Sequence, residues 1–246
     1  MDNIHEWFTN GQGAGLFAMF IPAEFKEARQ DVIAAIMNQF PLATIIFNSS
    51  AGMVAHHIPL LADAPLSFDT YNMTCAGNMT CAGLLVGHVA RRNDIHQQVD
   101  DGDEVLVIFR ADDSYISPNW YPSKAQHHKA VPTWNYQAVH FYRKIRFFDD
   151  VKALTALVGK MTKHFEGQTN SKAGWKMADA PHDYMADQLA KVVGLQIDLS
   201  RCLAKSKLSQ NRDRSDQVSV AKNIQEKTDN AAFLTGSMAR QLKETE

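Results

Sequence analysis

The sequence predicts an α+β domain in which helices pack around a β-barrel. Short apolar runs that suit strands fill the middle of the chain, and two helical patterns interrupt them. Strands and helices do not alternate in the regular βαβ order that a Rossmann fold requires. The chain has 246 residues and 45% hydrophobic content, which is enough for one large domain or two small ones.

The N-terminal residues 1–18 are expected to form a flexible leader. Gly11, Gly13 and Gly15 imitate a dinucleotide-binding motif, but the strand and helix that must flank such a motif are missing. Pro22 then opens a predicted helix, because proline suits the first helical position. Pro41 ends this helix. Its apolar stripe consists of Phe25, Ala28, Val32, Ile36 and Phe40.

The middle of the chain contains the predicted strands. They comprise residues 42–47, 53–61, 84–89, 104–109, 138–148 and 194–199. Residues 49–52 form a turn between the first two. Residues 104–109 are apolar on both faces and predict a buried strand. Residues 194–199 alternate apolar and polar side chains with a period of two, which is typical of a strand with one covered face.

Two more helices are predicted. Asp149 or Asp150 caps the first, and Asp179 or Asp183 begins the second. From about residue 221 the composition turns polar, and the last residues suit either a short amphipathic helix or a frayed tail. We therefore divide the chain into a leader (1–18), one domain (19–220) and a polar C-terminal tail (221–246).

Composition excludes several classes of protein. The net charge is −2, without the basic excess of many nucleic-acid binders. Three cysteines, Cys75, Cys81 and Cys202, do not suggest a disulfide framework, and no second pair stands at zinc-ligand spacing, so we expect no metal site. No basic cluster marks a signal peptide, and no apolar run approaches about 18 residues. We expect a cytoplasmic protein. Residues 73–77 recur as 79–83, which we interpret as a local expansion in a loop.

Four segments are dense in polar and aromatic residues: 87–93, 115–124, 131–136 and 205–211. Cores are built from apolar residues rather than from this mixture. Cations neutralise a phosphate, and tryptophan or tyrosine covers a planar ring, so the mixture suits a flat anionic ligand such as flavin mononucleotide (FMN). Taken alone, each segment also has a purely structural interpretation, in which its aromatics and prolines brace a loop.

These four segments resemble the signature blocks of the PaiB-like FMN-binding family, in the same order. Residues 19–25 and 55–60 also resemble family blocks, so the match runs from about residue 19 to about residue 220. His56 stands where the family usually has a hydroxyl residue. The resemblance implies the split β-barrel of pyridoxamine-phosphate oxidases, with peripheral helices. It also implies a homodimer with FMN at the subunit interface.

Carried over from the family, the phosphate end of FMN falls to His57, His88, Arg91 and Asn93. Arg91 is the preferred phosphate ligand, because a guanidinium can engage two phosphate oxygens. Ring and ribityl contacts fall to the second and third segments. These contact residues are Tyr115, Ser117, Trp120, Lys124, Thr133, Trp134 and Asn135.

Three functions remain open at this point. The resemblance implies a negative transcriptional regulator. An FMN-dependent oxidoreductase, such as a flavin reductase or oxidase, is the alternative, because a flavin supplies the chemistry itself. A heme-binding or heme-degrading protein ranks third. The sequence shows no helix-turn-helix with a basic recognition helix, and Asp213 and Asp216 interrupt the one basic cluster, so we expect no tight direct DNA binding.

Overall fold

The computed structural model describes residues 19–69, 79–170, 172–228 and 231–244. The expected leader and the first copy of the short repeat lie outside these residues. The strands are β1 (Leu42–Ser49), β2 (Gly52–Pro59), β3 (Leu61–Ala62), β4 (Ser67–Asp69), β5 (Met79–Ala90), β6 (Glu104–Ile116), β7 (Thr133–Phe148) and β8 (Val192–Lys207). The α-helices are α1 (Gln30–Gln39), α2 (Ile95–Gln98), α3 (Lys124–His127), α4 (Val151–Thr169), α5 (His182–Leu189), α6 (Arg214–Lys227) and α7 (Ala232–Glu244).

The strands form one antiparallel sheet in the order β2-β1-β6-β7-β8-β5-β3, with β4 also paired to β5. β2 and β3 are nearly continuous in sequence, yet β2 pairs with β1 at one edge while β3 pairs with β5 at the other. This segment therefore closes the sheet into a barrel. An α+β fold built on a split β-barrel with peripheral helices, as the sequence predicts, is confirmed.

Gly87 on β5 makes this closure possible. A Cβ atom there would come within 2.8 Å of the Pro59 carbonyl oxygen and of the Leu60 side chain. Real Cβ contacts are not this short, so only glycine lets the chain between β2 and β3 approach β5.

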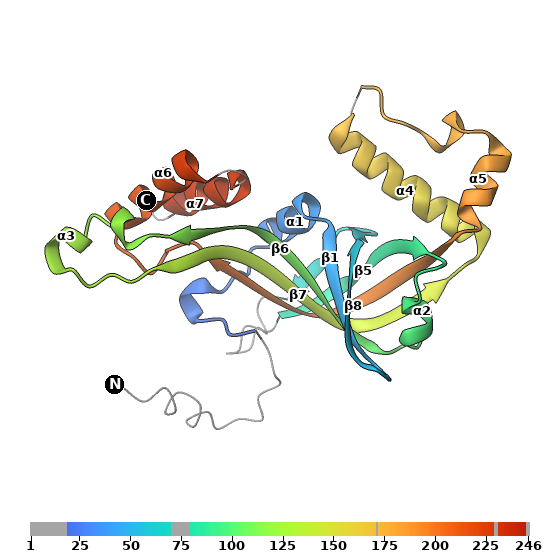
Figure 1. The fold of residues 1–246 in the computed structure, drawn as a ribbon, viewed down its shortest axis with the longest axis horizontal. Helices are drawn as coiled ribbons and strands as arrows, with labels where there is room; N and C mark the ends of the chain where they lie inside the picture. Colours follow the sequence, from blue (N-terminus) through green and yellow to red (C-terminus); the bar gives the residue numbers. More distant parts are fainter. Residues whose placement is uncertain (1–18, 70–78, 171, 229–230, 245–246) are drawn as a thin grey trace.

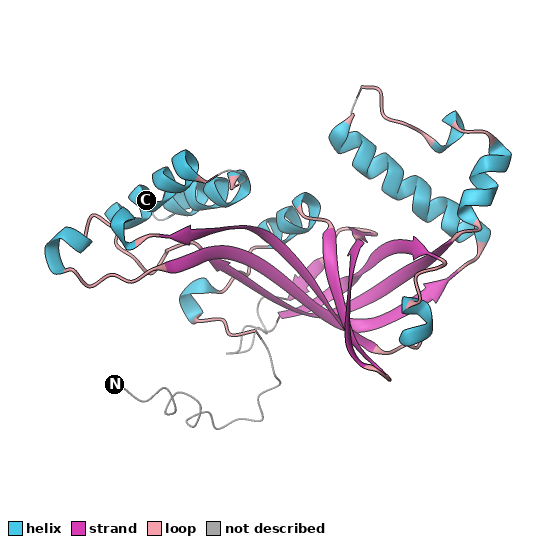
Figure 2. Cartoon of the chain, in the orientation of Figure 1, coloured by secondary structure: helices cyan, strands magenta, loops and turns pink. Residues whose placement is uncertain are grey.

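Helices cover one side of the sheet along its length (Figures 1 and 2). α1 buries Ile33 and Ile36 in the barrel core, where Phe109 and Phe141 pack edge to face. α4 packs on the β3–β5 side of the barrel through apolar side chains such as Leu157. In the described part of the chain, no helix combines the length and apolar character needed to cross a membrane.

β6, β7 and β8 continue past the barrel as a three-stranded ribbon, seen on the left of Figure 1. We call residues 113–116, 133–138 and 204–207 of these strands the extension. β6 and β7 stay paired to Ile116 and Thr133, and β7 and β8 to Tyr136 and Lys207. α6 and α7 lie on one face of the extension. Their shared core contains Ile116, Leu208, Val220, Ile224, Leu234 and Met238.

Three features differ from the sequence-based expectations. The second copy of the short repeat, residues 79–83, forms the start of β5 and not part of a loop. The helix expected from Pro22 begins at Gln30, because residues before it form a 3₁₀ turn (Ala23–Phe25) and Lys26 then bridges to Lys205 at the free edge of β8. The strands expected at 104–109, 138–148 and 194–199 each continue into segments that looked like loops. Polar and aromatic residues hide strand pairing there, because the pairing is made by the backbone.

Candidate functional site

The two faces of the extension carry alternate residues of the same strands. One face is covered by α6 and α7. The other, which we call the outer face, carries Tyr115, Trp134, Tyr136, Lys205 and Lys207. Successive side chains of a strand point to opposite faces, so each sequence segment contributes to both.

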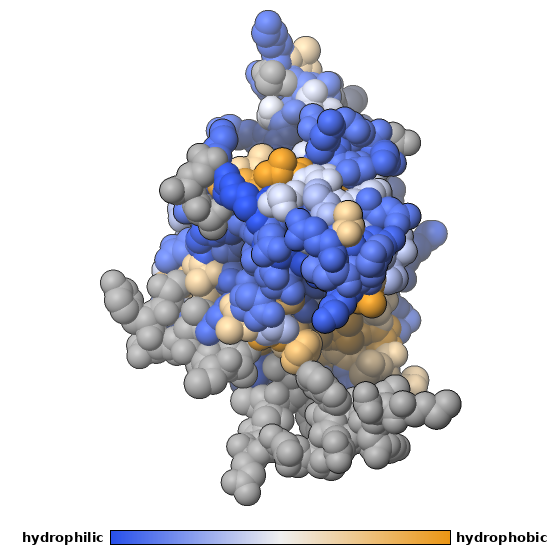
Figure 3. Space-filling model, turned by 90° about the vertical axis from the view of Figure 1, so that its left-hand side faces the viewer, coloured by the Kyte–Doolittle hydropathy of each residue, from blue (hydrophilic) through white to orange (hydrophobic). Residues whose placement is uncertain are grey.

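Two aromatic rings stand free on the outer face. Tyr115 and Trp134 are directly opposite each other on β6 and β7 and remain 47% and 52% exposed. Their ring centroids are 6.0 Å apart at an interplanar angle of 75°. Figure 3 shows this end of the molecule as largely hydrophilic, with apolar residues reaching the surface in both its upper and its lower part. Exposed large aromatics of this kind are typical of a binding surface.

Two lysines occupy the β8 side of the same face. Lys205 is only 6% exposed, and its Nζ donates to the Phe20 carbonyl oxygen at 3.0 Å. The Nζ also lies 5.1 Å from the ring centroid of Tyr136. Lys207 donates to the Thr133 hydroxyl. Burial lowers the pKa of Lys207, and the charges of Lys205 and Arg212 lower it further.

Neither lysine forms an ion pair within the described residues, although each is largely or partly buried. A buried ammonium normally has a carboxylate or another anion beside it. Two neighbouring cations without such a partner, on the same face as exposed aromatic rings, suit a phosphorylated flat ligand. The residues present therefore fit FMN.

The covered face shows the opposite arrangement, because its polar groups bind one another. Asn135 is fully buried, and its Nδ2 donates to the Ser209 hydroxyl at 2.9 Å. The Gln137 amide donates to the Ser206 hydroxyl, which donates to Glu27 at 2.8 Å. Asn135 thus lies on the other side of the sheet from its neighbour Trp134.

The remaining predicted residues of the second segment lie at the tip of the extension. The Ser117 hydroxyl accepts from the Asn119 backbone N–H at 3.2 Å and caps a 3₁₀ turn. Lys124 donates to the Asn119 amide oxygen at 2.6 Å. Trp120 packs against the α6–α7 core, with the Lys227 ammonium 5.8 Å from its ring centroid. Ser117 and Trp120 therefore make contacts within the chain that stabilise its fold.

His57 lies on the outer side of the barrel, far from the aromatic pair. It faces Thr44 on β1 with 3.0 Å between Nδ1 and the hydroxyl oxygen, and Thr44 in turn faces Ile108 on β6. At about 3.3 Å per strand residue, Tyr115 lies about 20 Å further along β6 than Ile108. One protomer therefore does not bring His57 and the aromatic pair together.

His88, Arg91 and Asn93 lie at the end of β5, next to α2. The Arg91 guanidinium donates to the Ala190 and Val192 carbonyl oxygens at 3.0 and 3.2 Å and pairs with Asp149 at 3.3 Å. Asp100 and Asp101 line the same shallow pocket of about 320 Å³. The N–H donors of Arg91 are therefore already bonded, and three carboxylates lie around this pocket.

Asn93 and His88, the other two predicted residues at the end of β5, differ in their contacts. The Asn93 amide oxygen accepts from the Ile95 backbone N–H at 3.1 Å and stabilises the start of α2. Burial lowers the pKa of His88, whose buried Nδ1 has no hydrogen-bond partner within the described residues.

The eleven predicted residues therefore lie in three places: the outer side of β2, the end of β5, and the extension with its tip. Sequence reasoning pointed to the segments that contain Tyr136, Lys205 and Lys207 but did not select these residues. The usable signal was their alternation with buried polar residues at a period of two, in Trp134-Asn135-Tyr136 and Lys205-Ser206-Lys207.

Comparison with known proteins gives a consistent match. Residues 19–201 match the family described as "Putative FMN-binding domain". Protease synthase and sporulation protein PAI 2 of Bacillus subtilis is 29% identical over 230 residues, which cover 92% of this chain and 99% of that protein. Uncharacterized protein AN0679 of Emericella nidulans is 27% identical over 230 residues, covering 82% and 88% of the two chains.

Solved structures with a similar fold include the FAD and heme binding protein of Mycobacterium smegmatis. It aligns with a TM-score of 0.47 and 15% identity over 79% of this chain and 78% of its own. The flavocytochrome Anf3 of Azotobacter vinelandii aligns with a TM-score of 0.46 and 9% identity over 74% and 69%. The fold described above rests on the strand order and barrel closure of this chain itself.

Proposed function

Because the chain belongs to the family described as "Putative FMN-binding domain", we propose that it binds FMN on the outer face of the extension. The observation that carries this proposal is the pair of lysines without ion-pair partners in the described residues, Lys205 and Lys207, on the same face of the sheet as the exposed Tyr115 and Trp134. The ammonium groups hold the phosphate, and the aromatic rings cover the isoalloxazine ring. Thr133, which already accepts from Lys207, lies within the same group.

A second copy of the chain completes the site in this proposal. The outer sides of β1, β2 and β6 carry exposed or half-buried apolar residues, such as Leu42, Met53 and Ile108, which a barrel-to-barrel contact would cover. In such a twofold dimer, His57 of one protomer reaches a flavin held by the extension of the other. This arrangement accounts for the separation of about 20 Å within one chain. We therefore propose a cytoplasmic homodimer with FMN at its interface.

FMN supplies hydride and electron transfer when it is bound. The residues of this chain bind and orient it. Trp134 and Tyr115 exclude water from one side of the ring, and Lys207 holds the phosphate charge. The phosphate in turn favours the charged form of Lys207, whose pKa is lowered in the chain alone.

The relation to PaiB-type proteins supports a negative regulatory role for this chain. We propose that such a role does not depend on tight DNA binding by the isolated chain. α6 and α7 bury Val220, Ile224 and Leu234 against the sheet, and Lys222 pairs with Glu226 on the exposed side of α6. This exposed side therefore carries both signs of charge. An FMN-dependent oxidoreductase remains the alternative function.

The first test is the visible absorption spectrum of the purified protein, followed by a fluorescence titration with FMN. We expect flavin bands, saturation near one FMN per chain and a dimer in sedimentation at micromolar concentration. A Soret band or the absence of saturable FMN binding would overturn the proposal. Consumption of reduced nicotinamide nucleotide by the FMN-loaded protein would favour the oxidoreductase. Nanomolar binding to one promoter fragment, but not to scrambled DNA, would favour a direct repressor.

A further inference from the structure

A second cavity lies away from the flavin site, between α1, α4 and the β3–β4 segment. Its volume is about 760 Å³, which is within the usual range of small-molecule sites. None of the eleven predicted flavin residues lines it. α1 and α4 stand on the helix-bearing side of the sheet, whereas the outer face of the extension looks to the opposite side (Figure 1).

The floor of this cavity is apolar. Met37 from α1, Leu61 from β3 and Leu66 and Phe68 from the following segment line it. Met37 and Leu61 belong to the packed interior, while Leu66 and Phe68 are half-buried. The Gln30 amide donates to the Phe68 carbonyl oxygen at 3.3 Å and ties α1 to β4, so the floor is held at both sides.

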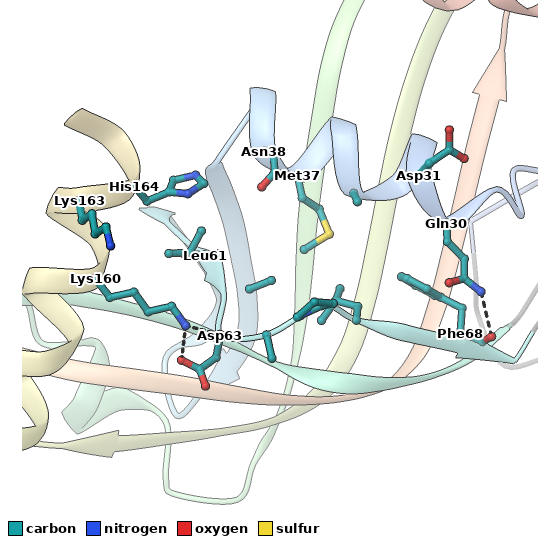
Figure 4. Close-up of a pocket in the computed structure, with 15 residues that line it drawn as sticks. Gln30, Asp31, Met37, Asn38, Leu61, Asp63, Phe68, Lys160, Lys163 and His164 are labelled. Atoms are coloured by element: carbon teal, nitrogen blue, oxygen red, sulfur yellow. Dashed lines mark hydrogen bonds and ion pairs between the residues drawn. The ribbon is translucent and has the colours of Figure 1, made fainter. Parts of the chain in front are cut away.

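The α4 side of the cavity is cationic. Lys160, Lys163 and His164 leave α4 on the side that faces α1, as Figure 4 shows, because residues three and four apart share one helix face. Lys160 is paired with Asp63 at 2.7 Å. Lys163 forms no ion pair or hydrogen bond within the described residues. Among the described residues, Asp31 is the one carboxylate on the opposite wall, and it is paired with Arg240 at 2.6 Å.

We propose that this α1–α4 pocket binds an amphipathic carboxylate. Its apolar body packs on Met37, Leu61, Leu66 and Phe68, and its carboxylate meets the ammonium of Lys163. Lys163 is exposed and, within the described residues, is the lysine of this wall without an ion-pair partner, so the pocket selects an anion over a neutral or cationic molecule of the same shape. The pocket is separate from the flavin site, and its occupation does not depend on FMN.

The test is isothermal titration of the full chain with decanoate, below its micelle concentration, in parallel with 1-decanol and decylammonium. We expect decanoate to bind at least about fivefold more tightly than decanol, and decylammonium to bind least. Lys163→Glu should weaken decanoate about tenfold and leave decanol unchanged. Lys152→Glu makes the same charge change on an exposed residue of α4 outside the pocket, and it should leave both ligands unchanged.

A filling variant locates the ligand. Ala34 is exposed on α1 and lines the pocket, so Ala34→Phe should weaken decanoate and decanol alike while thermal unfolding stays near that of the wild type. Equal binding of the three ligands, equal effects of Lys152→Glu and Lys163→Glu, or no effect of Ala34→Phe would each overturn the proposal. Saturating FMN should not change decanoate binding. Competition between the two would place the flavin in this pocket and overturn the separation of the sites.

Discussion

The two faces of the extension are built from the same three strands, yet they are completed in opposite ways. On the covered face, Asn135 binds Ser209, and Gln137, Ser206 and Glu27 form a chain of hydrogen bonds under α6 and α7. On the outer face, Trp134 is half exposed and Lys207 lacks a carboxylate partner within the described residues. Along each strand, residues that stabilise the covered face therefore alternate with residues that we assign to binding on the outer face. Single substitutions can separate the two roles.

The largest expected effect on stability lies in the covered face. Leu234 on α7 is fully buried between the helices and the sheet. Leu234→Ala should reduce the free energy of unfolding by about 2–5 kcal/mol, because it leaves a cavity in a packed core. Urea denaturation measures this change. Val218→Ala, at a half-exposed position on α6, is the matched control and should cost less than about 1 kcal/mol. Equal losses would mean that α6 and α7 do not pack as described.

Low pH should destabilise the covered face of the extension by protonating Glu27. Burial alone would raise the pKa of this carboxyl, but hydrogen bonds from the Arg29 side chain and backbone and from Ser206 outweigh burial and lower it. A lowered pKa in the folded state means that this stabilisation is complete above the ordinary value of 4.5 and is lost as the pH falls below it.

The variant Glu27→Gln tests this sign. It should lower the free energy of unfolding at pH 7 by about 1–3 kcal/mol, because Arg29 and Ser206 lose a charged acceptor. It should also flatten the decline in stability between about pH 5 and pH 3, measured by urea midpoints. A steeper acid decline in the variant than in the wild type would contradict the assignment.

Trp134 and Asn135 are adjacent on β7 and point to opposite faces of the extension. Substituting each in turn therefore tests whether the outer face binds FMN and the covered face stabilises the fold. Trp134→Ala should weaken FMN binding about tenfold, because ring contacts of this kind are worth roughly 0.5–1.5 kcal/mol beyond area burial. It should change stability by less than about 1 kcal/mol. Asn135→Ala should leave FMN affinity nearly unchanged and cost about 1–3 kcal/mol, because the buried Ser209 hydroxyl loses its partner. If FMN titration and urea denaturation showed instead that Asn135→Ala weakens FMN and Trp134→Ala destabilises the fold, the roles of the two faces would be exchanged.

These pairs also show how much the sequence could predict. The barrel strands follow from apolar runs bounded by turn residues, and Asp150 caps α4 as one of the two predicted candidates. The segments 131–136 and 205–211 were identified as functional, but they appeared as loops, because polar and aromatic residues obscure a strand whose two faces are both non-apolar. Without the strand, the alternation that separates Trp134 from Asn135 has no meaning, so Asn135 was grouped with the flavin contacts.

The hydrogen bonds of Arg91 could not be predicted from the sequence for a different reason. Its motif correctly lies at the end of β5, but the carbonyl oxygens of Ala190 and Val192 come from residues about a hundred positions later in the chain. Strand pairing between β5 and β8 brings them together, and no local pattern encodes that. The expectation that Arg91 holds the phosphate is untested; we place the phosphate at Lys207 instead, because the Arg91 guanidinium is already paired with Asp149.

The smallest expected effect decides where the phosphate lies. A phosphate at Arg91 would have to replace Asp149 and approach Asp100 and Asp101, whereas at Lys207 it would meet a cation without a carboxylate partner in the described chain. Arg91→Ala should therefore change FMN affinity by less than about threefold. Lys207→Met, which keeps the aliphatic stem, should weaken FMN about tenfold or more, because it removes a charge-assisted bond.

Riboflavin, which lacks the phosphate, separates a phosphate contact from general damage to the fold. Lys207→Met should weaken FMN much more than riboflavin in paired fluorescence titrations, while Arg91→Ala should weaken neither. If Arg91→Ala instead weakens FMN tenfold and spares riboflavin, the phosphate lies at the end of β5, next to α2. In that case the outer face of the extension holds only the ring of the flavin, and its two lysines need another anion.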